Sequence, residues 1–213
     1  MLKLTEIAKN CEIVKHVTNR NKNLDDYLKV SSILPRDDVK KAYDVISSWP
    51  GYKPTPLVEL NKIAQFCGIK SVLFKDESMR FDLKSFKALG GAYAVADLVR
   101  DFILKGGKVE DYVVTTATDG NHGRSVAWGA NLAGCKAKIY IHAHVSKSRE
   151  TAMQDLGAEV IKINGNYEAS LSACKNDAEK NGWHIVSDTS WEGYTDIPRQ
   201  VMAGYSVIAT ECL

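Results

Sequence analysis

The sequence has 213 residues, of which 45% are hydrophobic and 25% charged, as expected for a globular protein large enough to bury a sizeable core. Its 28 basic and 26 acidic side chains give a net charge of +2 without any basic tract, so we expect neither a nucleic acid nor a membrane as its partner. No stretch approaches the roughly 18 uncharged apolar residues that a membrane-spanning helix needs.

The predicted elements begin after a polar, weakly patterned extension over residues 1–36. Asp37 and Asp38 then open a helical pattern that Pro50-Gly51 ends, and acidic residues in a first turn suit the helix dipole. Residues 71–75 have the composition of a buried strand, and residues 85–104 that of a long helix closed by a glycine pair.

From residue 112 onward, strand patterns alternate with helical patterns. Strands are predicted over 112–116, 137–141, 159–163 and 184–186, and helices over 121–132, 147–156, 167–180 and 198–205. This alternation indicates βαβ units, and hence an α/β fold with open parallel sheets and helices on both faces. Ligands of such folds bind at the carboxyl ends of the strands.

The five cysteines are odd in number, widely spaced and never arranged as a CxxC pair. This spacing favours reduced thiols over a disulfide framework or a zinc site, and reduced thiols are typical of the cytoplasm. Residues 1–17 are interrupted by charges every few positions and lack the apolar segment of a signal peptide. We therefore predict a cytoplasmic protein.

Lys87 lies in the first turn of the predicted helix 85–104. The positive end of the helix dipole disfavours an ammonium there, and a neutral amine is what a carbonyl-binding lysine needs. An isolated lysine of this kind would usually be a surface residue. Its neighbours favour a functional role, because Phe86 and Leu89 are apolar and Gly90-Gly91 within a helix is costly without a packing or ligand reason.

A second candidate segment covers residues 115–123, where a threonine-rich strand turns through Gly120 into a helix. Gly120 would permit close approach of the backbone to a ligand, and Asn121 can donate and accept hydrogen bonds. The alternative is that Asp119 or Asn121 only caps the helix. His122 is more easily explained as a packed or hydrogen-bonded residue than as a general base.

Two further histidines, His142 and His144, flank Ala143 at the end of a predicted strand. They have no cysteine or carboxylate partner at ligand spacing, so we predict no metal site.

Four motifs together resemble the fold-type II, tryptophan synthase β-like enzymes that use pyridoxal 5'-phosphate (PLP). They are Thr55-Pro56-Leu57, Lys75-Asp76-Glu77, Ser85-Phe86-Lys87 and Gly120-Asn121-His122-Gly123, in the family's order and approximate spacing. Within that group, residues 81–91, 117–123 and 188–194 are most similar to the diaminopropionate ammonia-lyases. The resemblance covers roughly residues 35–210.

This resemblance implies a PLP-dependent lyase that eliminates ammonia from 2,3-diaminopropionate and yields pyruvate. Lys87 would bind the cofactor aldehyde, with Phe86, Gly120 and Asn121 as further cofactor-binding residues. Asp119 would bind the substrate ammonium or take an α-proton, and Asp188 would bind substrate. From its residue type alone, Asp188 is as readily a turn or cap residue.

The resemblance also implies a domain division. Residues 1–112 would form the N-terminal part of the large PLP-binding domain, residues 113–196 a small α/β domain, and residues 197–213 the start of a return to the large domain. The glycine-rich phosphate loop of the family lies in its C-terminal half, beyond the segment matched here. Family members are commonly homodimers, which we expect of the full-length protein.

Three interpretations of function therefore stay open. The chain could be a piece of a PLP lyase, a short catalytically inactive relative that serves as a binding module, or a serine or threonine dehydratase of the same fold. Dehydratases usually carry Ser or Thr where this chain has Asp119, which argues against the third interpretation.

Overall fold

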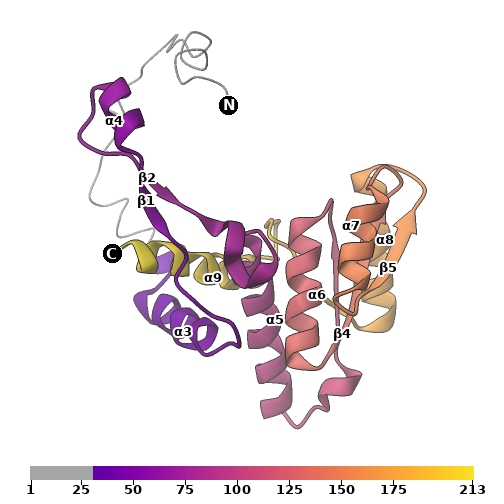
Figure 1. The fold of residues 1–213 in the computed structure, drawn as a ribbon. Helices are drawn as coiled ribbons and strands as arrows, with labels where there is room; N and C mark the ends of the chain where they lie inside the picture. Colours follow the sequence, from indigo (N-terminus) through magenta and orange to yellow (C-terminus); the bar gives the residue numbers. More distant parts are fainter. Residues whose placement is uncertain (1–30) are drawn as a thin grey trace. The chain divides into compact units, whose positions relative to one another are not determined.

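The computed structural model describes residues 31–213 (Figure 1). The predicted extension over residues 1–36 therefore lies almost wholly outside the described residues. Leu34–Leu213 form one compact unit, and the elements below belong to it. None of the helices in this part of the chain is both long enough and apolar enough to cross a membrane.

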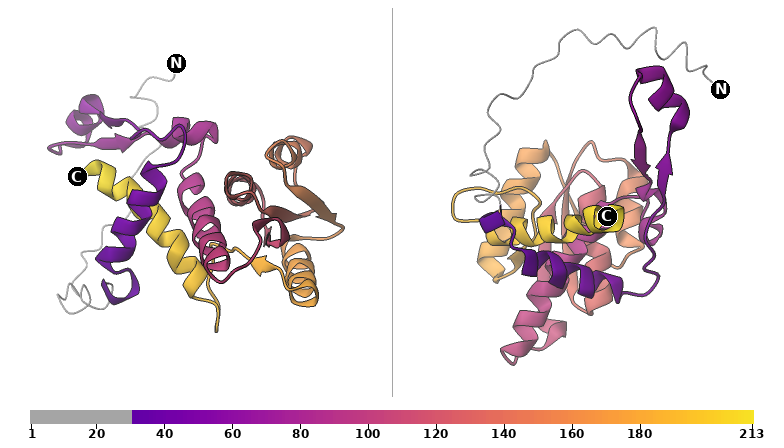
Figure 2. Two further views of the ribbon diagram at one scale, coloured as in Figure 1. Left: turned by 90° about the horizontal axis from the view of Figure 1, so that it is seen from below. Right: turned by 90° about the vertical axis from the view of Figure 1, so that its left-hand side faces the viewer.

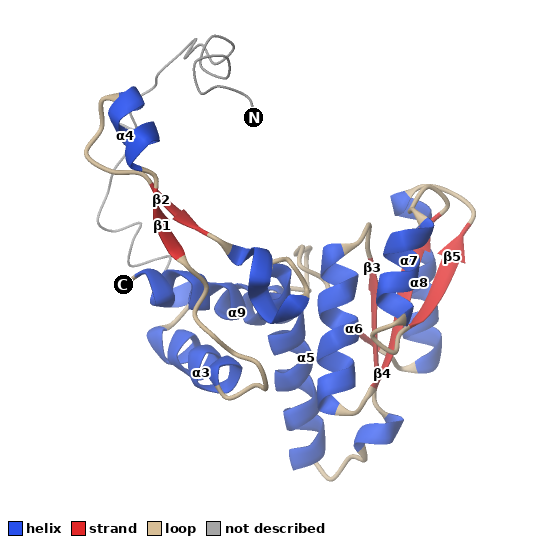
Figure 3. Ribbon diagram, in the orientation of Figure 1, coloured by secondary structure: helices blue, strands red, loops and turns tan. Residues whose placement is uncertain are grey.

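The centre of this unit is a four-stranded parallel sheet, as predicted. Its strands are β3 (Val113–Ala117), β4 (Lys136–His142), β5 (Glu159–Ile163) and β6 (His184–Ile185), in the spatial order β5-β4-β3-β6. Figure 3 labels β3, β4 and β5. The crossover helices are α6 (Asn121–Ala133), α7 (Lys147–Gln154) and α8 (Tyr167–Asn181). All four strands begin and end within one residue of the predicted positions, because β-branched runs between glycines mark them clearly.

Helices cover both faces of the sheet (Figure 2). On one face, α6 and α7 pack on the strands through Val126, Met153 and Ile139, which are fully buried. On the other face, Cys174 of α8 packs against Tyr140 of β4. Parallel sheets need this double cover because both of their faces are apolar.

A layer of helices packs outside α6. It contains α5 (Lys87–Leu104), then α9 (Asp196–Cys212) and α3 (Arg36–Ser47). Glycines let these helices approach closely: a Cβ on Gly129 of α6 would lie 2.6 Å from the Ala92 Cα of α5, and one on Gly90 would lie 2.4 Å from the Tyr205 ring of α9. The glycine pair in α5 therefore has a packing role.

The crossing of α5 and α9 makes a testable prediction. A Cβ on Gly204 would lie 2.3 Å from the Leu89 carbonyl oxygen, which is backbone and cannot rotate away. We expect Gly204→Ala to lower the free energy of unfolding by about 2 kcal/mol, because the two helices must separate. Met202→Ala, at an exposed site on the same helix, is the control. Urea unfolding of both variants measures the difference, and equal stabilities would contradict the close crossing.

The prediction of a buried strand over residues 71–75 is wrong, because the strand is shorter and is exposed. Only Leu73–Lys75 (β2) is a strand, and it pairs antiparallel with β1 (Leu57–Glu59), in a two-stranded ribbon separate from the main sheet. Leu73 and Phe74 are 58% and 51% exposed. An apolar run indicates a strand, but it does not reveal which partner the strand pairs with or whether anything covers it.

The ribbon is continued by short elements that the sequence did not predict. Helix α4 (Asn61–Cys67) connects β1 to β2, and a 3-10 segment (Glu77–Asp82) follows β2. A second 3-10 turn (Val109–Asp111) precedes β3. Helix α9 is also longer than the predicted 198–205, since it continues to Cys212.

A buried ionic cluster ties this ribbon segment to the end of α9. The Arg80 side chain is 1% exposed and donates to both Glu211 carboxylate oxygens, at 2.8 and 2.7 Å. Arg80 also bonds Glu77 at 2.8 Å, and Lys75 lies 2.7 Å from Glu211. Thr55 Oγ1 donates to Glu77. Two of the family-like motifs, Thr55-Pro56-Leu57 and Lys75-Asp76-Glu77, thus build this cluster.

Candidate active site

A left-handed stretch of backbone leads into Lys87. Phe81, Asp82 and Lys84 have φ values of 48°, 58° and 55°, and none of them is glycine. Each such residue stores strain of order 1 kcal/mol, and strained backbone of this kind clusters at functional sites. Helix α5 begins directly after this stretch, at Lys87.

Hydrogen bonds fix the backbone of Lys87. Its N–H donates to Ser85 Oγ at 3.2 Å, and its carbonyl accepts from Ser125 Oγ of α6 at 2.5 Å. Ser125 Oγ also accepts from the Ala92 N–H at 3.0 Å. The buried Ser125 hydroxyl of α6 is therefore hydrogen-bonded to the first turns of α5 through two backbone groups.

The Lys87 side chain is directed at Asp188, which follows β6. The Nζ to Oδ2 distance is 2.5 Å, and the two side chains are 28% and 25% exposed. The amine also lies 5.6 Å from the centre of the Phe86 ring and 5.5 Å from that of the Tyr205 ring. A half-buried lysine thus lies near two aromatic rings, and in the described part of the chain Asp188 is the carboxylate with which it pairs.

His122 lies behind Asp188 and is buried. Its Nδ1 is 3.7 Å from Asp188 Oδ2, and its Nε2 is 2.8 Å from the Val186 carbonyl oxygen. Burial would raise the pKa of Asp188, but the neighbouring His122, the hydrogen bond from Lys87 and the charge of Lys87 lower it. Burial lowers the pKa of His122. The histidine is thus packed and hydrogen-bonded, as expected.

Asp119 has a different partner from Lys87. It is 61% exposed at the end of β3, and its Oδ1 lies 3.0 Å from Nε2 of His142 at the end of β4. Arg149 donates to the Asp119 carbonyl at 3.1 Å. The carboxyl ends of two neighbouring parallel strands therefore present an oriented carboxylate.

The turn into α6 is held by Thr118. Its Oγ1 accepts from the N–H groups of Gly120, at 3.1 Å, and of Gly123, at 3.2 Å. Asn121 begins the helix and is exposed, and the N-cap residue is Gly120, so neither Asp119 nor Asn121 caps the helix through its side chain. The simple capping role considered for Asp119 or Asn121 is therefore wrong.

The family model for pyridoxal-phosphate-dependent enzymes matches residues 48–213, which is most of the chain. The chain belongs to this family. The diaminopropionate ammonia-lyase of Escherichia coli K12 is 39% identical over 196 residues, covering 87% of this chain. An L-threonine ammonia-lyase of Geobacter sulfurreducens is 28% identical over 159 residues, covering 75% of this chain and 36% of that protein.

Solved structures agree with this assignment. The crystal structure of the Escherichia coli diaminopropionate ammonia lyase in complex with D-serine superposes with a TM-score of 0.79 at 40% identity, covering 84% of this chain and 49% of that one. A PLP-dependent aspartate racemase superposes with a TM-score of 0.70 at 27% identity, covering 84% and 51%. The fold is therefore fold-type II, as predicted. The chain spans about half the length of the curated ammonia-lyases it matches.

The residues of this PLP-family chain suit the aldehyde end of the cofactor. Lys87 supplies a primary amine at a helix start, flanked by aromatic rings. The buried Tyr205 hydroxyl has no hydrogen-bond partner among residues 31–213, so a polar atom is left free on a ring next to the amine. Gly90-Gly91 is not a phosphate cradle, because Tyr205 and Ser125 fill the space above it.

Several residues of this site gave no usable signal in the sequence. Tyr205 and Ser125 reach Lys87 only because α9 and α6 pack against α5, and His142 meets Asp119 only because β3 and β4 are neighbours. The carboxyl-end rule for parallel sheets could have indicated His142, since it ends a predicted strand.

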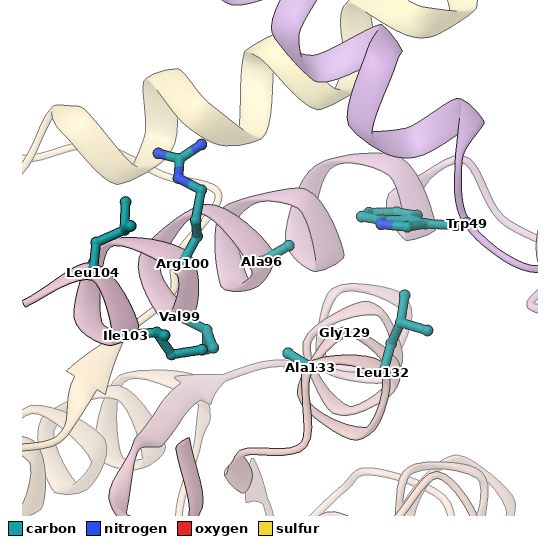
Figure 4. Close-up of a pocket in the computed structure, with 9 residues that line it drawn as sticks. All are labelled: Trp49, Ala96, Val99, Arg100, Ile103, Leu104, Gly129, Leu132 and Ala133. Atoms are coloured by element: carbon teal, nitrogen blue, oxygen red, sulfur yellow. The ribbon is translucent and has the colours of Figure 1, made fainter. Parts of the chain in front are cut away.

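Two other features of the unit lie apart from this site. A largely apolar groove of ≈ 480 Å³ lies between α5, α6 and Trp49, and none of the predicted site residues lines it. Figure 4 shows the residues that line this groove. Over the described part of the chain, no group of three or more His, Cys, Asp or Glu side chains is placed to hold a metal ion.

Proposed function

We propose that this chain carries the lysine-bearing half of an active site that eliminates ammonia from 2,3-diaminopropionate with PLP. The observation that carries the proposal is Lys87, held at the start of α5 with its amine 2.5 Å from Asp188, in a chain 39% identical to a diaminopropionate ammonia-lyase. The more distant threonine ammonia-lyase, at 28% identity, gives less support to the dehydratase alternative.

Lys87 would hold the cofactor aldehyde, and Phe86, Gly120 and Asn121 would line the cofactor. When bound, PLP supplies an electron sink for negative charge at the substrate Cα. Phe86 is supported by its ring, which lies 5.6 Å from Lys87 Nζ. Asn121 is supported by its exposed position at the start of α6, where its amide is not engaged in capping.

Two groups would handle the substrate protons. The neutral amine of Lys87 would take the α-proton of one enantiomer, and Asp119 would take that of the other or bind the substrate ammonium. His142 holds one Asp119 oxygen, which leaves the second oxygen for substrate. Asp188 would hold the positive charge of the substrate amine when it does not pair with Lys87.

The predicted domain division, localisation and oligomeric state are also part of this proposal. Residues 113–196 would form the small α/β domain and residues 1–112 the N-terminal part of the large domain, with residues 197–213 the start of a return to the large domain. The full-length protein would be a cytoplasmic homodimer acting on a small amino acid.

The test is a substrate comparison with the purified chain and added PLP. We expect pyruvate to form faster from D- and L-diaminopropionate than from L-serine or L-threonine. Asp119→Asn is expected to slow one diaminopropionate enantiomer by about 100-fold more than the other, as for loss of one general base. Glu192→Gln, an exposed change in another of the family-like segments, is the control.

Faster pyruvate formation from serine or threonine would instead support the dehydratase alternative. Absence of both turnover and PLP binding would show that this chain alone is not the enzyme, and would leave the piece of a PLP lyase and the non-catalytic binding module as the interpretations. Equal slowing of both enantiomers would contradict the two-base role of Asp119.

A further inference from the structure

The hydrogen bonding of His122 defines where its proton lies. A backbone carbonyl oxygen only accepts hydrogen bonds, so Nε2, which is 2.8 Å from the Val186 oxygen, must carry a hydrogen. In the neutral ring, Nδ1 is then a bare acceptor. This nitrogen is buried and has no hydrogen-bond partner among residues 31–213.

The unpartnered nitrogen faces a carboxylate. Nδ1 lies 3.7 Å from Asp188 Oδ2, the same oxygen that receives the Lys87 ammonium at 2.5 Å. Two acceptors face each other across this gap, and such an arrangement is favourable only when a proton lies between them. When Lys87 is charged, its ammonium already neutralises the Asp188 carboxylate. No proton is then needed on Nδ1 of His122.

We propose that His122 is a second, latent charge partner of Asp188, which takes up a proton on Nδ1 whenever the positive charge of Lys87 is withdrawn. The proton comes from solvent, and no bond other than N–H is made. The inference rests on the proposed function in one respect, namely that Lys87 acts in the reaction as a neutral amine, which has lost that charge. His122 is thus a positioning residue, acting through Asp188.

The charged groups that act on His122 are Asp188 and Lys87. Burial lowers the pKa of His122, Asp188 raises it, the Val186 hydrogen bond raises it, and Lys87 lowers it. Loss of the Lys87 charge therefore changes two influences in the same direction. It removes the repulsion between Lys87 and His122, and it leaves the partly buried Asp188 carboxylate without its ammonium.

Proton uptake by His122 when Lys87 loses its charge would keep Asp188 ionised and in place throughout the reaction. A partly buried carboxylate that loses its only cation would otherwise take up the proton itself or swing toward water. Because the Nε2–Val186 bond holds the ring, the histidine can become charged without moving. The site would then keep one negative charge ready for a substrate amine.

The experiment follows the ring nitrogens of His122 by long-range ¹H–¹⁵N NMR of the chain over a pH series. His122→Gln identifies the His122 signals among the five histidines, and its amide can still donate to the Val186 carbonyl. Lys87→Met and Lys87→Gln remove the charge in two ways, and Lys87→Arg keeps it as the matched control.

We expect wild type to show the Nε2–H tautomer. The proton affinity of His122 should rise about tenfold or more in both uncharged variants, as for a nearby charge lost at low dielectric. It should stay unchanged in Lys87→Arg, and adding Asp188→Asn to Lys87→Met should cancel the rise. An Nδ1–H tautomer in wild type, or the same titration in Lys87→Met as in wild type, would overturn the inference.

Addition of PLP to wild type separates the inference from the proposed function. If the uncharged variants raise the proton affinity of His122, the latent partnership stands. If PLP then leaves both the His122 signals and the visible spectrum unchanged, only the proposed role of Lys87 in cofactor binding fails. If PLP binds Lys87 as an uncharged imine, with its absorption in the near ultraviolet rather than the visible, and His122 does not take up a proton, the inference itself fails.

Discussion

Lys87→Ala is expected to abolish the visible absorption band that PLP gives when it is bound to a lysine amine. In the chain, Lys87 is the lysine placed at a helix start between Phe86, Tyr205 and Asp188. A lysine held in one place beside aromatic rings can present its nitrogen to an aldehyde in a fixed geometry, whereas a mobile surface lysine does not. The loss should be complete, because alanine offers no nitrogen.

The measurement is an absorption spectrum with added PLP, followed by borohydride reduction and peptide mass spectrometry. Reduction should place the pyridoxyl group on the peptide that contains Lys87. Lys105→Ala, a change at the exposed far end of the same helix, should keep the band and serves as the control. A band of equal strength in Lys87→Ala would remove Lys87 from the proposed site.

Arg80→Met should produce the largest loss of stability among the predicted variants, about 3–5 kcal/mol, as for removal of one partner of a buried ion pair. The side chains of Arg80 and Glu211 are each 1% exposed, so the variant leaves the Glu211 carboxylate buried with Lys75 as its one remaining cation among residues 31–213, beside the neutral donors Tyr52 and Thr55. Urea unfolding measures the loss. Arg199→Met, which breaks an exposed pair with Asp196, should change stability by less than about 0.5 kcal/mol.

The same cluster predicts how stability depends on pH. Burial would raise the pKa of Glu211, but hydrogen bonds from Arg80, Lys75 and Tyr52 lower it to about 2. A carboxyl group whose pKa is depressed in the folded state stabilises the fold above its unfolded pKa, and this contribution is lost as the pH falls toward the folded pKa.

Stability should therefore decrease by about 3 kcal/mol between pH 5 and pH 2 through this group. Glu211→Gln should remove most of that dependence, at the cost of lower stability at pH 7. An unchanged acid dependence in Glu211→Gln would show that the cluster does not govern it.

Much of the fold was predictable from the sequence by itself. The strand and helix patterns from residue 112 to residue 182 match the structure closely, because β-branched runs alternate with helical segments that end at Gly134 and Gly182, both in the left-handed conformation. Local conformational preference determines such boundaries, and each boundary needs only a few neighbouring residues. The motifs around Lys87 and Gly120 likewise indicated the PLP family, to which the chain belongs.

The pairing of residues far apart in the chain was decided only by the tertiary structure. Lys87 and Asp188 are 101 positions apart, and Arg80 and Glu211 are 131 apart, so no local pattern relates them. The strand at residues 73–75 looked buried because its residues are apolar, yet within residues 31–213 it pairs with one other short strand and is left exposed. Composition determines which residues favour burial, whereas the packing of helices and strands determines which of them are buried and which side chains meet.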